Sequence, residues 1–433
     1  MKVAVIGTGY VGITTAASLG EMGHQIMGVD IDEEKIKKLQ SGILPIYEPG
    51  VEPLIQDLMR QGRIQFTTDL REAVCFADII FIAVGTPSLP NGQADLAYVE
   101  SAAAGIGKCM DCYKVIVNKS TVPIGTAERV KKIITSEVNK RDQFIKFDVV
   151  SNPEFLQEGK ALQDARWPDR IILGCASENA KNLMNKLYQG VQAPKYFTSP
   201  KNAEMIKYAS NAFLATKISF MNEMARLCDT LEVDVTEVAQ GMGMDKRIGP
   251  YFLQAGIGYG GSCFPKDVAA LYSMGQQAHL EMPILREAQK VNQTQCDWFV
   301  EKMKGIVNLE GKNIALLGLS FKPETDDIRE APSIKLIDLF LRNGAKISAY
   351  DPKAMKPIQN IFPQITMAED CYQVFDGADI VVLCTEWKQF QKLDWMRAKR
   401  MMRGNYLFDG RNALSAKELT AIGFHYWGVA KKT

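Results

Sequence analysis

A glycine pattern near the start of the chain restricts the fold more than any other feature. Gly7, Gly9 and Gly12 follow the short apolar run Lys2–Ile6 and precede a stretch with helical spacing at 9–22. In such a G-x-G-x-x-G turn, the first glycine permits a tight turn and the second lets the backbone approach a pyrophosphate. The third lets helix and strand pack closely. The sequence therefore predicts a dinucleotide-binding βαβ unit, with the helix N-terminus facing the phosphates.

Asp30 indicates which dinucleotide is bound. It follows the second predicted strand, Gln25–Val29. There a carboxylate can accept hydrogen bonds from both ribose hydroxyls, and it would repel a 2′-phosphate. The predicted cofactor is therefore NAD rather than NADP. Lys35, early in the next helix, is either a contact to the adenosine ribose or a solvated lysine of the helix face.

The first 199 residues alternate between strand and helix patterns, which is typical of a parallel sheet covered by helices on both faces. After residue 200 the pattern is helical. Further strands are predicted at 79–84, 115–118 and 148–150, and helices at 202–231, 267–277 and 285–304.

A weak internal repeat follows the helical part. NIALLG at 313–318, KISAYD at 346–351 and ADIVVL at 378–383 resemble three segments of the first part. The turn that begins at Gly318 lacks the second and third glycines of the first loop, so we expect this sheet to bind something other than a second dinucleotide. The predicted fold is α/β, with two doubly wound Rossmann-like domains joined by a central long-helix region. The predicted domains are 1–199, 200–305 and 306–433.

Composition excludes several classes of protein. The 433 residues carry a net charge of +1, which gives no electrostatic footprint for nucleic acid or an anionic membrane. No apolar run is long enough to cross a bilayer, and glycines interrupt the N-terminal apolar region, so we expect a cytoplasmic protein. Cys109 and Cys112 form a lone C-x-x-C among nine irregularly spaced cysteines. We expect free thiols there and no metal site.

A glycine-rich segment contains the first candidate for chemistry. Residues 256–267 read GIGYGGSCFPKD, which places Cys263 at the start of a predicted helix and beside Lys266. A helix N-terminus and an ammonium both favour a thiolate. From these residues alone, Cys263 is either a nucleophile or a buried structural cysteine.

Two further pairs are spaced four residues apart. Lys207 and Asn211 share one face of the long predicted helix, within an apolar stretch. They are either a site for proton transfer and oxyanion stabilisation or a snorkelling lysine and a capped amide. Glu154 and Glu158, in NPEFLQEG, are either an acid–base pair or a solvated helix face.

Together these segments resemble the nucleotide-sugar dehydrogenases, the UDP-glucose/GDP-mannose dehydrogenase family. The resemblance runs in order from residue 1 to about 430. The matching segments are GTGYVG at 7–12, YEPG at 47–50, VGTP at 84–87, KSTVPIGT at 119–126, NPEFLQEG at 152–159, EMIKYASNAFLATKISFMNE at 204–223, GIGYGGSCFPKD at 256–267 and FKPETDDIREAPS at 321–333.

The resemblance implies an NAD-binding domain, a central dimerisation region and a C-terminal UDP-sugar-binding domain. It also implies a four-electron oxidation of a nucleotide sugar, UDP-glucose to UDP-glucuronate, with NAD as cofactor and a homodimer as the assembly. Cys263 matches the nucleophile that forms a thiohemiacetal and then a thioester. The other catalytic matches are Lys207, Asn211, Asp267, Thr121 and Glu154.

The resemblance also implies two sets of binding residues. Within the substrate set, Arg247 matches an arginine that reaches the neighbouring subunit's sugar site. The NAD set is Gly7, Gly9, Tyr10, Val11, Gly12, Asp30, Lys35, Thr86, Thr121, Glu158, Lys266 and Arg329. The substrate set is Glu154, Phe155, Leu156, Glu158, Lys207, Asn211, Arg247, Phe252, Leu253, Gln254, Ala255, Gly256, Gly260 and Lys322.

Three alternatives remain at this point. A sibling enzyme would act on GDP-mannose or a UDP-N-acetylhexosamine. A hydroxyacid dehydrogenase of similar layout would use the Lys/Asn pair without a cysteine and perform one two-electron step. An NAD-sensing regulatory protein would bind NAD without turnover.

Overall fold

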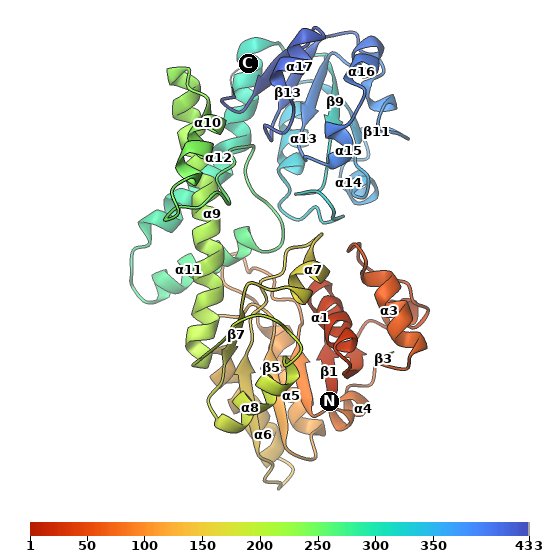
Figure 1. Ribbon diagram of the computed structural model, residues 1–433, viewed down its shortest axis with the longest axis vertical. Coiled ribbons are helices and arrows are strands. Elements are labelled where there is room, and N and C mark those ends of the chain that lie inside the picture. The colour runs from red at the N-terminus through yellow and green to blue at the C-terminus, as the bar shows by residue number, and fades with distance from the viewer. Residues whose placement is uncertain (432–433) are drawn as a thin grey trace. The chain divides into compact units, whose positions relative to one another are not determined.

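The computed structural model describes residues 1–431, which form two compact units, Met1–Ser210 and Asn211 onward (Figure 1). Each unit contains one sheet with helices packed on it. The predicted fold class is confirmed: two doubly wound sheets are present, and a long helix, α9 (Pro200–Leu231), lies between them in the sequence.

The sheet of the first unit has eight strands. The first two strands have the predicted bounds, and the other predicted strands differ by one or two residues at their ends. In sheet order the strands are β3 (Ile64–Thr67), β2 (Gln25–Val29), β1 (Lys2–Ile6), β4 (Ile79–Ile82), β5 (Lys114–Asn118), β6 (Phe147–Ser151), β7 (Ile171–Gly174) and β8 (Lys195–Thr198).

Both faces of this sheet are covered, because successive side chains of each strand point to opposite sides. Val3 and Val5 pack into one core cluster, whereas Ala4 and Ile6 pack into another. The first cluster is completed by α1 (Tyr10–Glu21), α2 (Glu33–Gln40), α3 (Val51–Arg60) and α8 (Glu178–Leu187). The second is completed by α4 (Leu70–Phe76), α5 (Ala97–Cys109) and α6 (Thr126–Asn139).

The alternating pattern predicts a parallel sheet, but the first sheet is not parallel throughout. The strands from β3 to β6 are parallel, and so is the pair β7 and β8, but β7 runs antiparallel to β6. Ser151 faces Gly174 across this junction. The short helix α7 (Ala161–Arg166) lies in the connection between β6 and β7. The prediction fails here because this connection returns β7 in the opposite direction instead of crossing over.

The second unit begins with helices. These are the C-terminal part of α9, followed by α10 (Val235–Gly243), α11 (Phe264–Gln277) and α12 (Pro283–Ile306). The three predicted helices are thus confirmed with small extensions. Among residues 1–431, none of the helices is long and apolar enough to cross a membrane.

A second, parallel sheet follows. Its strands, in sheet order, are β11 (Thr366–Met367), β10 (Lys346–Tyr350), β9 (Asn313–Leu317), β12 (Ile380–Leu383), β13 (Tyr406–Asp409) and β14 (His425–Gly428). Its remaining helices are α13 (Pro332–Arg342), α14 (Met355–Ile361), the 3₁₀ turn Gln373–Phe375, α15 (Lys388–Gln391), α16 (Trp395–Met401) and α17 (Ala416–Ala421). The order repeats that of β3-β2-β1-β4-β5-β6, which confirms the internal repeat.

Candidate active site

The three glycines of the first loop occupy three different environments. Gly7 has a φ of +96°, and a side chain there would lie 2.6 Å from the Ala83 carbonyl oxygen. A side chain at Gly12 would lie 1.9 Å from the Gly7 carbonyl oxygen. A side chain at Gly9 would meet no atom within 4 Å. Gly7 and Gly12 therefore close the turn, and Gly9 leaves its outer surface open for a pyrophosphate, so the loop fits NAD.

Asp30 is tied to this loop and to the next helix. The Thr8 amide and hydroxyl donate to Asp30 Oδ2 at 2.9 and 2.6 Å. Lys35 Nζ donates to the same oxygen at 2.8 Å. Burial alone would raise the pKa of Asp30, but the hydrogen bonds from Lys35 and Thr8 outweigh it and lower the pKa. Lys35 is therefore more than a solvated lysine, because it holds the carboxylate that faces the ribose in this type of fold.

The carboxyl ends of β4, β5 and β6 lie at one edge of the first sheet, where a doubly wound fold binds its ligands. Thr86 Oγ1 donates to the Thr121 carbonyl at 3.0 Å, which links the segments after β4 and β5. Thr121 is buried. Tyr10 opens α1, and Val11 packs against the core.

Glu154 and Glu158 do not lie on a helix, so the solvated helix face is wrong. The segment after β6 is an irregular loop, in which Glu154 is buried and Glu158 partly buried. The Leu156 amide donates to Glu154 Oε2 at 2.7 Å. The buried Glu48 accepts the Gly159 and Ala161 amides at 2.7 and 2.8 Å, so the YEPG segment anchors the end of the loop.

Lys207 forms a buried ion pair with Glu154. Lys207 Nζ lies 3.2 Å from Glu154 Oε1, and the two side chains are 4% and 5% exposed. Removing one partner of such a pair costs about 3–5 kcal/mol, because the other charge remains buried without compensation. Lys207 is therefore not a snorkelling lysine. Its ammonium also lies 5.2 Å from the centre of the Phe155 ring, and the Arg170 guanidinium lies 4.2 Å from the same ring.

Asn211 follows Lys207 by one turn of α9. Asn211 Nδ2 donates to Asp267 Oδ2 at 2.6 Å, and Lys266 Nζ donates to Asp267 Oδ1 at 2.7 Å. Asp267 is fully buried. Lys266, whose ammonium was predicted to favour the thiolate of Cys263, thus pairs with Asp267.

Cys263 is the N-cap residue of α11, as its predicted place at a helix start requires. Pro265 lies in the first turn of that helix. The Ser262 hydroxyl lies 3.6 Å from Cys263 Sγ. Cys263 is partly exposed, which agrees better with a nucleophile than with a buried structural cysteine.

Side chains that the sequence did not single out hold the glycine-rich segment before Cys263. Gly256 N donates to Asn222 Oδ1, and its carbonyl accepts from Gln295 Nε2, both at 2.8 Å. Asn292 pairs with both the amide and the carbonyl of Tyr259. Arg411 donates to the carbonyl of Gly258 at 2.9 Å. For Asn222 and Gln295, the sequence signal was a buried amide within a helix.

The second unit also carries further residues that the sequence predicted to bind substrate, Gly260, Lys322 and Arg247, and one predicted to bind NAD, Arg329. A side chain at Gly260 would lie 2.1 Å from the Glu330 carbonyl oxygen, so only glycine fits. Lys322 Nζ lies 5.5 Å from the centre of the Phe321 ring. Arg329 and the exposed Arg247 pair with Asp327 and Asp245, two residues before each of them.

The middle of the segment from Phe252 to Gly256 borders a cavity. Phe252 has a φ of +63°, which is unusual for a residue with a side chain and indicates a constrained loop. The cavity has a volume of about 450 Å³. It is lined by Leu253, Gln254 and Ala255, by residues of α10, and by Arg411 and Asn412.

A Rossmann loop, an aspartate after the second strand and a doubly wound sheet define an NAD-binding protein of the dehydrogenase class. The chain belongs to the UDP-glucose/GDP-mannose dehydrogenase family. Residues 1–192 match the family's NAD binding domain, 201–294 its central domain and 315–416 its UDP binding domain. NAD is therefore the cofactor.

Individual relatives match over the whole chain. The UDP-glucose 6-dehydrogenase YwqF of Bacillus subtilis is 44% identical, covering 100% of this chain and 98% of the relative. The UDP-glucose 6-dehydrogenase of Pseudomonas aeruginosa is 43% identical with the same coverage. A UDP-glucose dehydrogenase structure from Pyrobaculum islandicum has 39% identity and a TM-score of 0.92, covering 100% of this chain and 98% of that one.

Proposed function

We propose that this chain is an NAD-dependent enzyme that oxidises the C6 alcohol of UDP-glucose to a carboxylate, giving UDP-glucuronate. The overall reaction consumes two NAD⁺ and one water for each sugar. Helix α9 carries the proposal: Lys207 is paired with Glu154, and Asn211, one turn later, is bonded to Asp267. Full-length similarity to UDP-glucose 6-dehydrogenases selects the sugar.

The proposed chemistry has two oxidation steps and one hydrolysis. NAD, when bound, accepts one hydride in each oxidation. After the first oxidation, Cys263 adds its sulfur to the C6 aldehyde and forms a thiohemiacetal. Oxidation of this adduct leaves a thioester at Cys263. Water then adds to the thioester carbon, the carbon–sulfur bond breaks, and the thiol and the carboxylate are released.

The polar residues on and around α9 would stabilise the oxygen at C6 and transfer its protons. We assign Lys207 and Asn211 to hold the C6 oxygen and stabilise its negative charge, and Lys207 also to accept the proton of the alcohol. Asp267 and Thr121 would position a water or base, and Glu154 would act as the acid–base group in thioester hydrolysis.

The binding residues keep the assignments that the family resemblance implies. The loop of Gly7, Gly9, Tyr10, Val11 and Gly12, with the other NAD residues of the first unit, is supported by the open face of Gly9 and by the Asp30–Lys35 pair. Within the sugar residues, the Phe252–Gly256 segment is supported by its constrained backbone and by the cavity that Leu253, Gln254 and Ala255 line. Gly260 and Lys322 keep their assignment from the family resemblance alone.

A homodimer is part of the proposal. Phe213, Phe220, Leu227 and Leu231 are exposed on α9 at intervals of seven, seven and four residues, so they lie along one face. An apolar stripe of this kind is typical of a helix that packs on a partner. The exposed Arg247 would reach the sugar site of the neighbouring subunit. The three-domain division at 199/200 and 305/306 and the cytoplasmic location remain predictions.

A panel of nucleotide sugars tests the substrate. Purified protein is mixed with NAD and with UDP-glucose, GDP-mannose or a UDP-N-acetylhexosamine, and NADH absorbance is followed while product is quantified. We expect the fastest turnover with UDP-glucose and two NADH per product. Faster turnover of another sugar favours the sibling enzyme. One NADH with free aldehyde refutes the thioester route, and NAD binding without turnover would identify a sensor.

Cys263→Ser tests the nucleophile. Because a serine hydroxyl is a much weaker nucleophile than a thiolate, we expect UDP-glucuronate formation to fall by at least about a thousandfold. Cys112→Ser is the matched control, since Cys112 is an exposed free thiol, and it should keep wild-type turnover. Carboxylate formation by Cys263→Ser at more than a tenth of the wild-type rate would exclude a covalent role for Cys263.

A further inference from the structure

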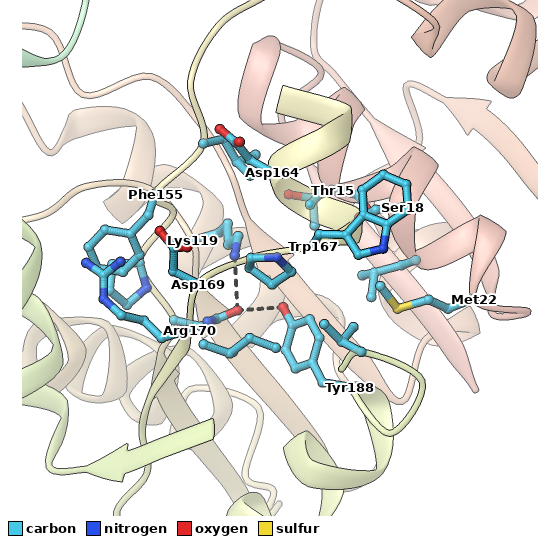
Figure 2. Close-up of a pocket in the computed structure, with 18 of the residues that line it drawn as sticks. Thr15, Ser18, Met22, Lys119, Phe155, Asp164, Trp167, Asp169, Arg170 and Tyr188 are labelled. Atoms are coloured by element: carbon cyan, nitrogen blue, oxygen red, sulfur yellow. Dashed lines mark hydrogen bonds between the residues drawn. The ribbon is translucent and has the colours of Figure 1, made fainter. Parts of the chain in front are cut away.

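Lys119, the residue after β5, has no assigned role, although its ammonium is held in a fixed polar network. Lys119 Nζ donates to Asn152 Oδ1 at 3.2 Å, and the Tyr188 hydroxyl donates to the same oxygen at 2.7 Å (Figure 2). Asn152 Nδ2 in turn donates to the Ile172 carbonyl at 2.9 Å. Contacts from the segment after β6, from β7 and from the segment after α8 therefore fix where this cation lies.

One side of Lys119 borders a cavity of about 140 Å³ (Figure 2). Phe155 and Leu156, which directly follow Glu154, line the same cavity. The side chain is therefore only partly exposed, and its accessible surface faces this cavity. The loop that carries Glu154 thus borders the same cavity as Lys119, and the centre of the Phe155 ring of that loop lies 5.2 Å from Lys207 Nζ.

Lys119 shares its surroundings with two other charges. Burial lowers the pKa of Lys119 to about 8; the negative charge of Glu154 opposes this shift and the positive charge of Lys207 adds to it. Electrostatic coupling is reciprocal, so the charge on Lys119 also repels the charge on Lys207. Both ammonium groups thus interact electrostatically with one buried carboxylate, and only that of Lys207 is in direct contact with it.

We propose that Lys119 is a positioning residue for the oxidation, whose positive charge makes Lys207 release its proton more readily. The neutral amine of Lys207 can then accept the proton of the C6 hydroxyl, while the hydride leaves C6 for NAD. The inference rests on the proposed function, in which Lys207 is that proton acceptor. Lys119 acts only through Lys207 and Glu154.

Other groups that face Lys119 do not substitute for this charge. Burial raises the pKa of Tyr188, so its hydroxyl stays neutral in the working pH range. Asp164, Asp169 and Arg170 also line the cavity, where solvent weakens their electrostatic effects. The Glu154–Lys207 pair remains the buried charged group with which Lys119 interacts.

The test compares Lys119→Met, which keeps the length of the side chain but removes the charge, with Lys119→Arg, whose guanidinium stays protonated. For each variant, kcat and both KM values are measured against pH with UDP-glucose and NAD. For Lys119→Met we expect the rising limb of kcat to move up by at least one pH unit. We expect kcat at pH 7.5 to fall about tenfold, with KM values within about threefold. For Lys119→Arg the limb should stay in place or move down.

Lys131→Met, which removes an exposed lysine on α6, is the matched control and should leave the pH profile unchanged. A Lys119→Met variant that loses kcat equally at all pH values, with a lower melting temperature, would show a structural role and overturn the inference. If Lys119→Met does not fold, an upward shift of the limb in Lys119→Arg overturns it.

A second readout does not need turnover. The rate at which acetic anhydride labels Lys207 is followed against pH by peptide mass spectrometry, because only the neutral amine reacts. Lys119→Met should raise the midpoint of this titration by at least one pH unit, and an unchanged midpoint overturns the inference. Absence of UDP-glucose oxidation by the wild type would instead refute the proposed function, and labelling would still decide the effect of Lys119 on Lys207.

Discussion

The two sheets share one plan but use their first turn differently. In both, a glycine with positive φ ends the first strand: Gly7 at +96° and Gly318 at +88°. In both, an aspartate follows the second strand and accepts hydrogen bonds from that turn: Asp30 from Thr8, and Asp351 from the Leu319 and Ser320 amides. The same local geometry therefore occurs twice.

The difference lies in what remains available to a ligand. Asp351 is fully buried, and its two oxygens also accept from Ser320 Oγ, the Trp387 indole and the amides of Lys353 and Ala354. Asp30 is partly exposed. One sheet thus uses its aspartate only to build the fold, whereas the other leaves its aspartate partly exposed, where we propose that it contacts the ribose of NAD. A duplicated turn does not imply a duplicated function.

The largest effect should come from closing the first turn. In Gly12→Val the new side chain would overlap the Gly7 carbonyl, because even a Cβ lies 1.9 Å from that oxygen. We expect the Kd for NAD, measured by calorimetry, to rise by more than about a hundredfold, or about 2.7 kcal/mol. Gly305→Ala on α12, where nothing lies within 4 Å, is the control and should bind NAD normally. Normal binding by Gly12→Val would contradict the role of the loop.

Asp351→Asn should change stability rather than cofactor binding. An amide places an NH₂ group where one carboxylate oxygen accepts, so buried donors lose their partner at about 1–3 kcal/mol each. We expect the free energy of unfolding, measured in urea, to fall by about 2–3 kcal/mol, with an unchanged Kd for NAD. Asp376→Asn, at an exposed carboxylate of the same unit, should be neutral. Weaker NAD binding in Asp351→Asn would contradict the conclusion that Asp351 serves only the fold.

Asp30→Ala should weaken NAD binding and leave the stability of the fold nearly unchanged, the opposite of Asp351→Asn. Because the carboxylate would lose its hydrogen bonds to the ribose, the Kd for NAD should rise about tenfold, or about 1.4 kcal/mol. The ratio of the Kd for NADP to that for NAD should fall, since the repulsion of a 2′-phosphate is removed. The melting temperature should change by only a few degrees. A variant that discriminates against NADP as strongly as the wild type would refute the assigned role of Asp30.

The smallest expected effect is on the pH dependence of the stability of the fold. The pKa of Asp30 is lowered in the folded protein, so this group stabilises the fold above its unfolded pKa of about 4 and loses that contribution as pH falls. Burial raises the pKa of Asp409, at the end of β13, so its ionisation destabilises the fold as pH rises above about 4.

Melting temperatures between pH 3.5 and 6.5 would measure this contrast. The difference between wild type and Asp30→Asn should shrink toward acid pH, by less than about 1 kcal/mol because Asp30 is partly solvated. The Asp409→Asn variant should gain relative stability as pH rises. The same pH trend in both variants would contradict the opposite pKa shifts.

Much of the fold follows from local patterns. Hydrophobic spacing placed β1 and β2 at their observed bounds and α9 within two residues, because period and end signals are properties of a short segment. The antiparallel β7 escaped prediction, because strand direction depends on how a connection folds over the sheet. The Glu154–Glu158 spacing was misleading for a similar reason, because this segment is an irregular loop whose end is held by Glu48, a residue distant in sequence.

The sequence alone determined the glycine turn and its aspartate, since both requirements act within thirty residues and follow from backbone geometry. It also placed Cys263 at a helix start and Lys207 and Asn211 one turn apart. Only the tertiary structure decided the partners. The pairing of Lys207 with Glu154, the contact between Asn211 and Asp267, and the proximity of Lys119 to the ion pair join residues that are distant in sequence. Such contacts exist because burial brings charges together in a medium where each needs a partner, and no local pattern encodes that requirement.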